Sequence, residues 1–438
     1  MLLSLREQRP VFKDTRHSER AACTCAVRVV RNLRTSDNVS QLSHEPTRPC
    51  TARVCWYLSA GRGVFDFIVV GGGIAGTGVA DALAASARVA LVEAETHPGY
   101  HSTARSAALF APNYGSEPFR ALARLSGAFL RAPPADFCTT ALLHARGALN
   151  IARSDQRAHL EKSAAEIRAR GGDIRELSFT AARELLPLLR PAYVACATYE
   201  PDVLDIDVAA LLQGFLRRGK ARGVQLLLGE RVAAASFSAG AWQISHQGRT
   251  ITGRVLVNAA GAWADELAIR CGGAPLGLQP LRRTAALIEA PPQVAVNHWP
   301  AVFDIDECFY LKPDAGRLLI SPADEEPTPP GDVYPEDLAV AVAVDRIQGA
   351  LDIEVRRVTH SWAGLRTFAP DRNPVIGFDE QLPSFFWCCG QGGYGIQTSP
   401  AVSQLAAALA RGEPIQRDIA ALGLTAAQVS PARLRRAP

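Results

Sequence analysis

The clearest periodic pattern along the chain begins with the apolar run Phe65 to Val70, which three glycines follow. Beyond the glycines, apolar residues recur at helical spacing, at Val79, Ala80, Leu83 and Ala84. A second apolar run, Val89 to Glu93, comes next. The pattern therefore predicts a strand, a tight turn, a helix and a second strand.

Strand and helix patterns of the same kind return later in the chain. Val255 to Asn258 reads as a strand that enters a small-residue turn and a helix from Ala264 to Arg270. The run Phe385 to Cys389 predicts a buried strand, followed by a glycine-rich turn and a helix through Leu409. An amphipathic helix presents Val208, Leu211, Leu212 and Phe215 on one face.

These recurring elements predict an α/β protein of two domains. A Rossmann-like nucleotide-binding domain is expected over residues 64–145, 196–275 and 360–438. A discontinuous substrate domain, built mainly on an antiparallel sheet, is expected over residues 146–195 and 276–359. The cluster Asp324 to Asp332 is rich in Pro, Gly and acids, which predicts a surface loop and a candidate lid.

Residues 1–63 show no sustained periodicity and are predicted to lie outside the fold. They carry ten Arg and one Lys against five acids, so the rest of the chain has a net charge of −2 although the whole has +4. The segment lacks the apolar core of a secretory signal and holds too many acids for a transit peptide. A wrongly assigned start is the favoured interpretation, and a flexible arm is the alternative.

Composition removes several classes of protein. A body with net charge −2 is not expected to bind nucleic acid. Ten cysteines in 438 residues do not indicate a disulfide scaffold, and no apolar run is long enough for a membrane span. His97 and His101 are four apart, but Pro98 and Gly99 between them argue against a metal site. We expect a cytoplasmic protein, with peripheral attachment to the inner membrane as an alternative.

The first glycine turn carries the chemistry of a dinucleotide site. Gly71 allows a tight turn, Gly73 lets the backbone approach a pyrophosphate, and Gly76 permits close packing of helix and strand. The amino end of the helix supplies N–H groups for the anion. Glu93 ends the second strand 22 positions after Gly71, where a carboxylate accepts hydrogen bonds from the ribose hydroxyls. The motif does not separate NAD from FAD.

Six segments together resemble the FAD-dependent D-amino-acid oxidase and dehydrogenase superfamily, over residues 65 to about 435. They are, in order, VVGGGIAG, GYHSTARSAAL, VNAAGAWADEL, FYLKPDAG, SWAGLRTFAPDRNPVIG and CGQGGYGIQTS. Within the superfamily the chain is most similar to the soluble D-arginine dehydrogenase type. The resemblance implies FAD as cofactor and a D-amino acid as the small-molecule substrate.

The resemblance also assigns roles to particular positions. The substrate carboxylate would be bound by Arg366 and Tyr310 with help from Arg283, and Tyr114, Gly393 and Gln397 would complete the pocket. The cofactor would be held by Gly71, Gly73, Gly76, Glu93, Ser102, Thr103, Arg105, Ser106, Gly261, Gly392, Gly393, Tyr394, Gly395, Ile396 and Gln397. Without the resemblance, an ion-paired Arg366 and a sheet-face Tyr310 are the simpler interpretations.

Two departures from the D-arginine enzymes bear on the substrate. Ala148 stands where they have an acid for the guanidinium, and Leu109 stands where they have a histidine. A cationic side chain would be left unpaired there, at a cost of roughly 3–5 kcal/mol for a buried charge. Neutral and apolar D-amino acids are therefore expected.

The implied reaction is oxidation of a D-amino acid to an imino acid, by hydride transfer to the flavin, followed by hydrolysis. Electrons would pass on to a quinone, an electron-transfer protein or oxygen. One alternative is a glycine- or sarcosine-type amine oxidase that uses oxygen. Another is a flavin-binding subunit without a substrate of its own, and a third, nucleic-acid modification through the basic arm, is weakened by the charge of the body.

Overall fold

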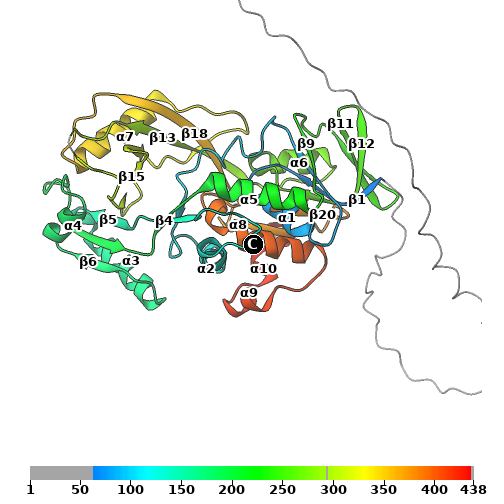
Figure 1. Ribbon diagram of the computed structural model, residues 1–438, viewed down its shortest axis with the longest axis horizontal. Coiled ribbons are helices and arrows are strands. Elements are labelled where there is room, and N and C mark those ends of the chain that lie inside the picture. The colour runs from blue at the N-terminus through cyan, green and yellow to red at the C-terminus, as the bar shows by residue number, and fades with distance from the viewer. Residues whose placement is uncertain (1–62, 293, 436–438) are drawn as a thin grey trace, which may run out of the picture. The chain divides into compact units, whose positions relative to one another are not determined.

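The computed structural model describes residues 63–292 and 294–435 of the chain. This part begins with a strand, a helix and a second strand. Strand β1 (Val64–Val70) leads into helix α1 (Ile74–Leu83) and then into strand β2 (Val89–Glu93). β1 and β2 pair in parallel (Figure 1). The prediction for this region is confirmed, whereas the prediction for residues 1–63 falls almost wholly outside the described residues.

An eight-stranded sheet surrounds this unit. Its main path runs β10-β11-β12-β1-β2-β9, with β20 paired to β12 and β19 paired to β20. The added strands are β9 (Gln225–Leu228), β10 (Ala235–Ser238), β11 (Ala241–His246), β12 (Arg249–Asn258), β19 (Val375–Phe378) and β20 (Phe385–Cys389). All five residues of β20 are buried, so the predicted buried strand is confirmed.

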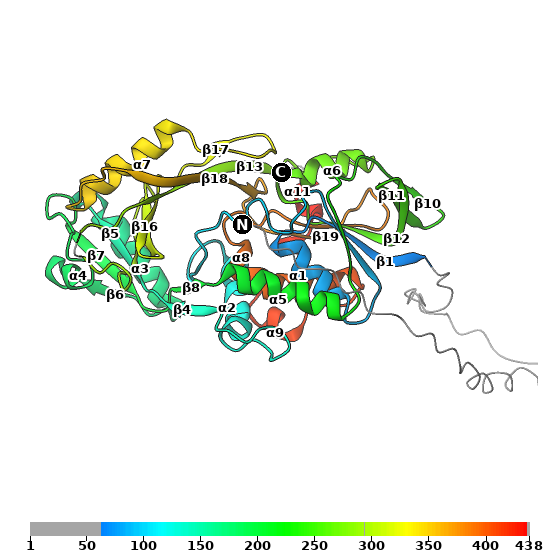
Figure 2. The ribbon, with the colours of Figure 1, turned by 45° about the horizontal axis from the view of Figure 1, so that its top comes forward.

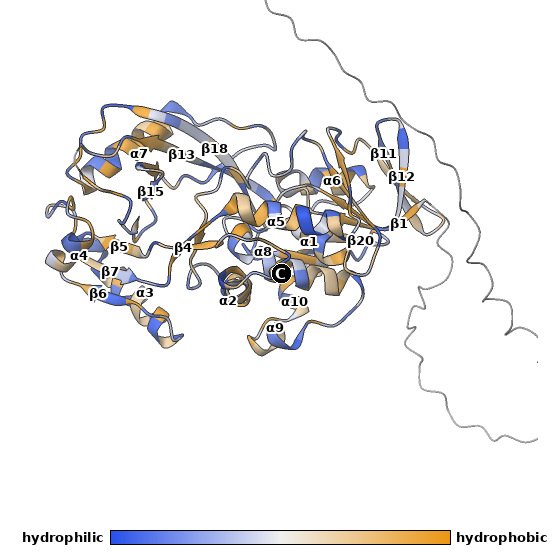
Figure 3. Cartoon of the chain, in the orientation of Figure 1, coloured by the Kyte–Doolittle hydropathy of each residue, from blue (hydrophilic) through white to orange (hydrophobic). Residues whose placement is uncertain are grey.

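Side-chain alternation explains why the buried half of β1, Phe67 to Val70, is apolar at every position. Phe67 and Val69 belong to one buried cluster together with α1 and the last long helix, whereas Ile68 and Val70 belong to another with β11 and β20. A central strand covered on both faces needs apolar residues at every position. Figure 3 shows this concentration of apolar colour on the strands in the middle of the sheet.

A second sheet of nine strands supports the other half of the molecule. Its main path runs β17-β13-β16-β15-β14-β5-β7-β6, with β18 paired to β13. Among its printed pairs, β14 with β5 is parallel and the others are antiparallel, which confirms the mainly antiparallel sheet. The strands are β5 (Ala148–Ala152), β6 (Arg175–Leu177), β7 (Cys196–Glu200), β13 (Gln279–Ile288), β14 (Ala301–Asp304), β15 (Tyr310–Asp314), β16 (Arg317–Ser321), β17 (Glu326–Pro327) and β18 (Val358–Phe368).

The exact domain bounds stay a prediction. β7 and β18 pair within the nine-stranded sheet, although the sequence pattern placed them in the nucleotide-binding half. A three-stranded sheet, β3-β8-β4, completes the strands with β3 (Leu109–Phe110), β4 (Leu143–Ala145) and β8 (Leu204–Ile206).

Helices cover the sheets, as Figure 2 shows for α1, α5 and α8. α1 packs against both α5 and α8, and α2 packs against α8. No helix among the described residues is both long and apolar enough to cross a membrane. The remaining helices are α2 (Glu117–Arg131), α3 (Arg157–Ala169), α4 (Phe179–Leu185), α5 (Val208–Ala221), α6 (Ala264–Arg270), α7 (Asp337–Ala350), α8 (Gly395–Ala410), α9 (Arg417–Ala421), α10 (Ala426–Val429), α11 (Ala432–Arg435) and the 3₁₀ turns η1 (Ser154–Gln156) and η2 (Gly261–Trp263).

A buried ion pair ties α1 to α5. The Asp81 carboxylate accepts hydrogen bonds from the Arg218 guanidinium at 2.6–3.1 Å, and Arg222 adds a second contact at 3.1 Å. Asp81 is 1% exposed and Arg218 is 7% exposed. A pair this deeply buried depends on both partners, because either charge alone would lack compensation.

Asp81→Ala is therefore expected to destabilise the protein strongly. Removal of the carboxylate leaves Arg218 buried and unpaired, which costs about 3–5 kcal/mol. The urea midpoint, followed by circular dichroism, should fall well below that of wild type. The matched control is Asp155→Ala, which removes an acid that is 71% exposed. Equal midpoints for both variants would contradict the importance of this pair.

Candidate functional site

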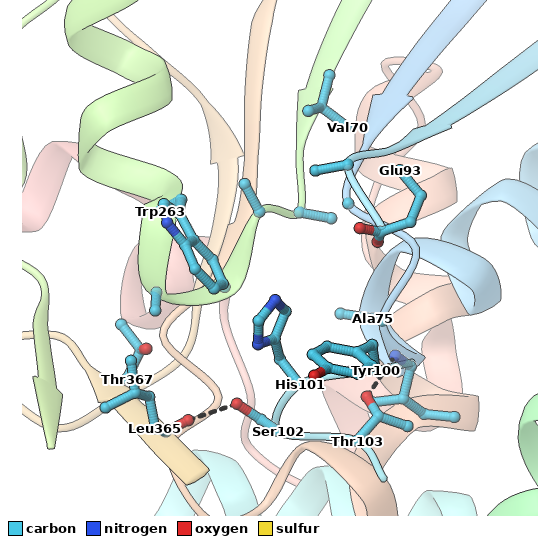
Figure 4. Close-up of a pocket in the computed structure, with 18 of the residues that line it drawn as sticks. Val70, Ala75, Glu93, Tyr100, His101, Ser102, Thr103, Trp263, Leu365 and Thr367 are labelled. Atoms are coloured by element: carbon cyan, nitrogen blue, oxygen red, sulfur yellow. Dashed lines mark hydrogen bonds between the residues drawn. The ribbon is translucent and has the colours of Figure 1, made fainter. Parts of the chain in front are cut away.

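A groove of about 220 Å³ lies at the carboxyl ends of β1, β2 and β12. In open α/β sheets this edge is where nucleotides bind. Figure 4 shows the groove between the β1–α1 turn, the loop after β2 and the η2 turn. Of the predicted cofactor residues, those that line it are Gly71, Gly73, Glu93, Ser102, Thr103, Ser106, Gly261, Gly392, Gly393, Gly395 and Ile396.

Two positions of the first turn must be glycine, because neighbouring backbone atoms lie too close to them for a Cβ atom to fit. A Cβ on Gly76 would lie 1.8 Å from the carbonyl oxygen of Gly71, and a Cβ on Gly71 would lie 2.3 Å from that of Ala259. Gly71 also has a φ of +110°, which L side chains rarely adopt. The turn, the helix and β12 are therefore packed too closely for any side chain, which leaves the N–H groups at the start of α1 facing the groove.

Glu93 is held in place by two backbone donors. The N–H of Gly72 donates to Oε2 at 2.5 Å and the N–H of Glu95 donates to Oε1 at 2.8 Å. A carboxylate oriented in this way at the end of β2 has the position expected of the ribose-binding acid.

The loop after β2 closes the groove through two hydroxyl groups. The backbone N–H of Ile74, in the first turn of α1, donates to Thr103 Oγ1 at 3.0 Å. Ser102 Oγ donates to the carbonyl oxygen of Leu365 in β18 at 2.5 Å (Figure 4). The loop therefore bridges the nucleotide-binding sheet and the nine-stranded sheet.

His101 is a groove residue that the sequence reasoning set aside. Its ring lies 4.6 Å from the ring of Trp263 and 4.9 Å from that of Tyr100, and Nε2 contacts Glu95 Oε1 at 2.9 Å (Figure 4). All four residues line the groove. The aromatic residues at 100 and 263 stand inside the two motifs, GYHSTARSAAL and VNAAGAWADEL, and that was the signal available in the sequence.

Arg105 does not line the groove but fastens its loop from outside. Its Nη2 contacts Asp332 Oδ1 at 2.5 Å, and its Nη1 donates to the carbonyl oxygens of Val333 and Ala363. The Tyr100 hydroxyl donates to Asp332 Oδ2 at 3.0 Å. The hydrogen bond from Arg105 lowers the pKa of the Asp332 carboxyl. The carboxylate therefore stays charged, and its contact with Arg105 is lost only when the pH falls through that lowered pKa. Arg105, Tyr100 and Asp332, called the clasp below, join the strap 328–336 to the groove loop.

At the other end of the groove, Arg366 lies against the turn that precedes α8. A Cβ on Gly393 would stand 3.0 Å from Nη1 of Arg366, so a side chain there would have to push the guanidinium aside by a few tenths of an ångström. The guanidinium of Arg366 makes no hydrogen bond and no ion pair within residues 63–292 and 294–435. An Arg with no protein partner beside a groove is available to bind an anion.

Arg283 and Tyr310, two further residues predicted to bind the substrate, share one face of the nine-stranded sheet with Arg366. Cross-strand partners and alternate residues lie on the same face of a sheet. The register pairs Arg283 with Gly364, two residues from Arg366, and pairs Tyr310 with Ser321. Tyr310 belongs to a small buried cluster against which Ala107, the residue after Ser106, packs, so Tyr310 lies beside the loop that forms one wall of the groove.

Arg283 and Arg366 are close enough to repel each other. Burial lowers the pKa of Arg283, and the charge of Arg366 lowers it further. Arg283 is partly satisfied, since Nε donates to the carbonyl oxygen of Asp324 at 2.7 Å and Nη2 donates to Glu325 at 3.2 Å. An anion placed between the two guanidinium groups would relieve the repulsion.

Tyr114 faces the same region from the loop after β3. Its hydroxyl donates to Glu307 Oε2 at 3.2 Å, and its ring lies 5.2 Å from that of Tyr394, which stacks on Phe119. Tyr114 is 42% exposed as a whole, but packing around its phenol group, with Tyr394 and Glu307 nearby, raises its pKa above the usual value, so the hydroxyl stays protonated and neutral. Glu307 is a second residue that the sequence reasoning missed, because only the fold brings it to Tyr114.

Two predicted cofactor residues sit behind the groove instead of in its wall. Tyr394 caps the amino end of α8, and the N–H of Ala111 donates to Oε1 of Gln397, which is 4% exposed. α8 starts at Gly395, inside the segment expected as a turn. These residues fix the loop that carries Tyr114.

Comparison with known proteins gives matches to a family model, to curated relatives and to solved structures. A family model described as DAO, FAD dependent oxidoreductase, matches residues 66–409. Glycine oxidase of Geobacillus kaustophilus is 25% identical over 373 residues, which cover 82% of this chain and 97% of the enzyme. A crystal structure of glycine oxidase from the same organism matches with a TM-score of 0.72 at 24% identity, over 83% of this chain and 99% of that one, and supports the fold.

A second relative is matched over a shorter stretch. Hydrogen cyanide synthase subunit HcnC of Pseudomonas aeruginosa is 27% identical over 226 residues, which are 48% of this chain and 50% of HcnC. The match thus spans about half the length of that relative. The finer likeness to D-arginine dehydrogenases stays a prediction.

The groove fits FAD, because Gly71, Gly76 and Glu93 provide the close turn and the oriented carboxylate that a dinucleotide requires. Asp332→Ala is expected to speed FAD release, since it frees Tyr100 and Arg105 of the clasp. A partly exposed ion pair contributes about 1 kcal/mol, so the increase should be roughly fivefold. Release is measured as the rise of flavin fluorescence after dilution.

The control for the clasp is Glu326→Gln, which removes an exposed acid from the neighbouring β17. Its release rate should equal that of wild type. If both variants release FAD at the wild-type rate, the clasp does not retain the cofactor.

Proposed function

The chain belongs to the DAO family of FAD-dependent oxidoreductases, and from that premise we propose that it oxidises the CH–NH₂ group of a D-amino acid with a neutral side chain. The product would be the imino acid, which water hydrolyses to the 2-oxo acid. Bound FAD supplies the acceptor for the two electrons and the hydrogen that leave the Cα–N unit. The reduced cofactor would pass its electrons to a quinone, an electron-transfer protein or oxygen.

The unpaired guanidinium of Arg366 carries this proposal. Within the described part of the chain it has no anionic partner, it lines the cofactor groove, and Gly393 leaves it room. A planar guanidinium binds a carboxylate through two parallel hydrogen bonds. Arg366 would thus fix the α-carboxylate and with it the direction of the Cα–H bond.

Arg283, Tyr310 and Tyr114 would complete the binding of the substrate. Arg283 adds positive charge opposite Arg366, and Tyr310 lies on the same sheet face. The Tyr114 hydroxyl is neutral and its one proton is donated to Glu307, so it would offer the substrate amine only an acceptor oxygen and would not remove the amine proton. The substrate would therefore react as the neutral amine, with no protein base among these residues.

The side-chain preference rests on Ala148 and Leu109. Ala148 is 2% exposed and lies on the same sheet face as Tyr310. It pairs with Ala301, and Phe303, two residues after Ala301 and so on the same face, pairs with Tyr310. Neither residue offers a charge to a cationic group, so a cationic side chain would be buried without a partner. A neutral side chain avoids this cost, which supports neutral substrates.

Two alternatives have support from particular relatives. The match to glycine oxidase over 97% of that enzyme favours a glycine- or sarcosine-type amine oxidase that uses oxygen. The match to HcnC, named as a subunit of hydrogen cyanide synthase, favours a flavin-binding subunit of a larger enzyme. Arg366 argues against a subunit without substrate, since it would have no function there.

Anaerobic mixing of the FAD-loaded protein with D-leucine, D-methionine, L-leucine, glycine, sarcosine and D-arginine tests the proposal. The flavin absorbance should bleach fastest with the neutral D-amino acids. Faster bleaching by D-arginine would refute the side-chain preference, and faster bleaching by glycine or sarcosine would favour the oxidase alternative. Peroxide released in air distinguishes oxygen from the other acceptors.

Arg366→Met is expected to raise the KM for the reactive amino acid while FAD stays bound. Loss of a hydrogen bond to a charged group costs about 1.5–3 kcal/mol, which corresponds to roughly 10- to 150-fold in kcat/KM. Bound flavin is checked by absorbance. The control is Arg356→Met, which removes an Arg that is 81% exposed. An unchanged kcat/KM in the Arg366 variant would exclude it as the carboxylate ligand.

A further inference from the structure

We propose that Glu325 positions the guanidinium of Arg283, so that one substrate carboxylate is bound by Arg283 and Arg366 together. Glu325 lies in the loop between β16 and β17. The inference rests on the proposed function and deepens it, because it names a residue that acts on the carboxylate site through another side chain.

The Glu325 carboxylate joins two arginines. Arg283 Nη2 donates to its Oε1 at 3.2 Å. Arg372 Nη2 donates to Oε1 at 2.9 Å and to Oε2 at 3.1 Å. The Arg283 side chain is 9% exposed, whereas that of Arg372 is 51% exposed. Glu325 thus connects a buried guanidinium of the substrate face to an anchor near the surface.

Arg372 lies beside the end of the groove that holds Arg366. Its guanidinium carbon is 3.9 Å from the centre of the Phe368 ring. Phe368 follows Arg366 by two residues in β18, so both project to the same face of the strand. A Cβ on Gly392, which lines the groove, would lie 2.2 Å from that ring. The ion pair of Arg372 with Glu325 is therefore next to the proposed carboxylate site.

The loop that carries Glu325 is fastened to β13. The Asp324 carboxylate accepts a hydrogen bond from the N–H of Thr284 at 2.7 Å and another from its hydroxyl at 2.8 Å. The carbonyl oxygen of Asp324 accepts from Arg283 Nε at 2.7 Å. β17 begins at the next residue after Glu325 and also pairs with β13. The carboxylate of Glu325 is therefore a fixed point against which Arg283 is oriented.

Arg283 keeps donors for an anion after these contacts are made. A guanidinium has five N–H donors, and Nε and Nη2 of Arg283 each direct one to the loop. Its Nη1 has no hydrogen-bond partner among the residues that the structure describes. Burial and the charge of Arg366 lower the pKa of Arg283, whereas Glu325 opposes this shift. Glu325 thus stabilises two neighbouring positive charges while the carboxylate site is empty.

A positioning role and a simple charge effect predict opposite signs. A negative group near an anion site repels the anion, so its removal would by itself strengthen anion binding. If Glu325 instead orients Arg283, its removal lets the guanidinium turn away from the like charge of Arg366. Carboxylate binding then weakens, because one of its two ligands is displaced.

Titration of the FAD-loaded protein with benzoate, followed by the flavin spectrum, tests this role. Glu325→Met removes both acceptor oxygens and should raise the Kd of benzoate about tenfold. Glu325→Asp keeps the charge but withdraws it by one methylene group, and should raise the Kd about threefold. The control is Glu354→Met, which removes an acid that is 72% exposed and should leave the Kd unchanged.

A double variant shows whether Glu325 acts through Arg283. Arg283→Met alone should weaken benzoate binding. Once Arg283 is absent there is no guanidinium to position, so Glu325→Met should cause no further loss in that background. Losses that add in the double variant would mean that Glu325 acts by another route, and would overturn the inference.

The remaining outcomes separate the inference from the proposed function. If Glu325→Met binds benzoate as tightly as wild type, or more tightly, Glu325 does not position Arg283 and the inference alone is wrong. Where Glu325→Met does not fold, as judged by its urea midpoint, an unchanged Kd in Glu325→Asp has the same consequence. If wild type shows neither a benzoate shift nor bleaching by any amino acid, the proposed function fails and the inference fails with it.

Discussion

The hydrogen bonds of the loop between Gly99 and Ser106 hold the functional half of the molecule together. Thr103 accepts from the first turn of α1, and Ser102 donates to β18, so one short segment joins the nucleotide-binding sheet to the nine-stranded sheet. Both hydroxyls lie in the wall of the groove. Displacement of this loop would release the clasp at Asp332 and would leave β18 joined to the groove through the backbone bond from Gly392 to Thr367. Under the proposed function, the loop and this bond together would set the position of the substrate relative to the flavin.

Positive charge on the substrate face gathers near the groove. Arg366 and Arg283 supply two positive groups there. Such a distribution suits a molecule with a carboxylate at one end and an uncharged group at the other. Ala148 and Phe303 lie on the same face and are apolar, so this part of the face accommodates methylene groups.

The sequence was sufficient for the parts of the fold that depend on local pattern. The run from Phe65 to Glu93 predicted β1, α1 and β2, because alternation, helical spacing and glycine chemistry act over a few residues. It could not supply the contacts of Asp332 with Arg105, 227 residues apart, or of Tyr114 with Glu307, 193 residues apart. Those contacts depend on the paths of loops far apart in the sequence, which no local pattern encodes.

The central claim is that Arg366 binds a carboxylate beside the flavin. The most direct measurement is a titration of the FAD-loaded protein with an unreactive carboxylate, such as benzoate, that follows the flavin absorption spectrum. The account predicts that benzoate causes a saturable spectral shift in wild type, that benzoate competes with the amino acid, and that the shift is lost in Arg366→Met. A shift of equal affinity in that variant, or no competition with the amino acid, would contradict it.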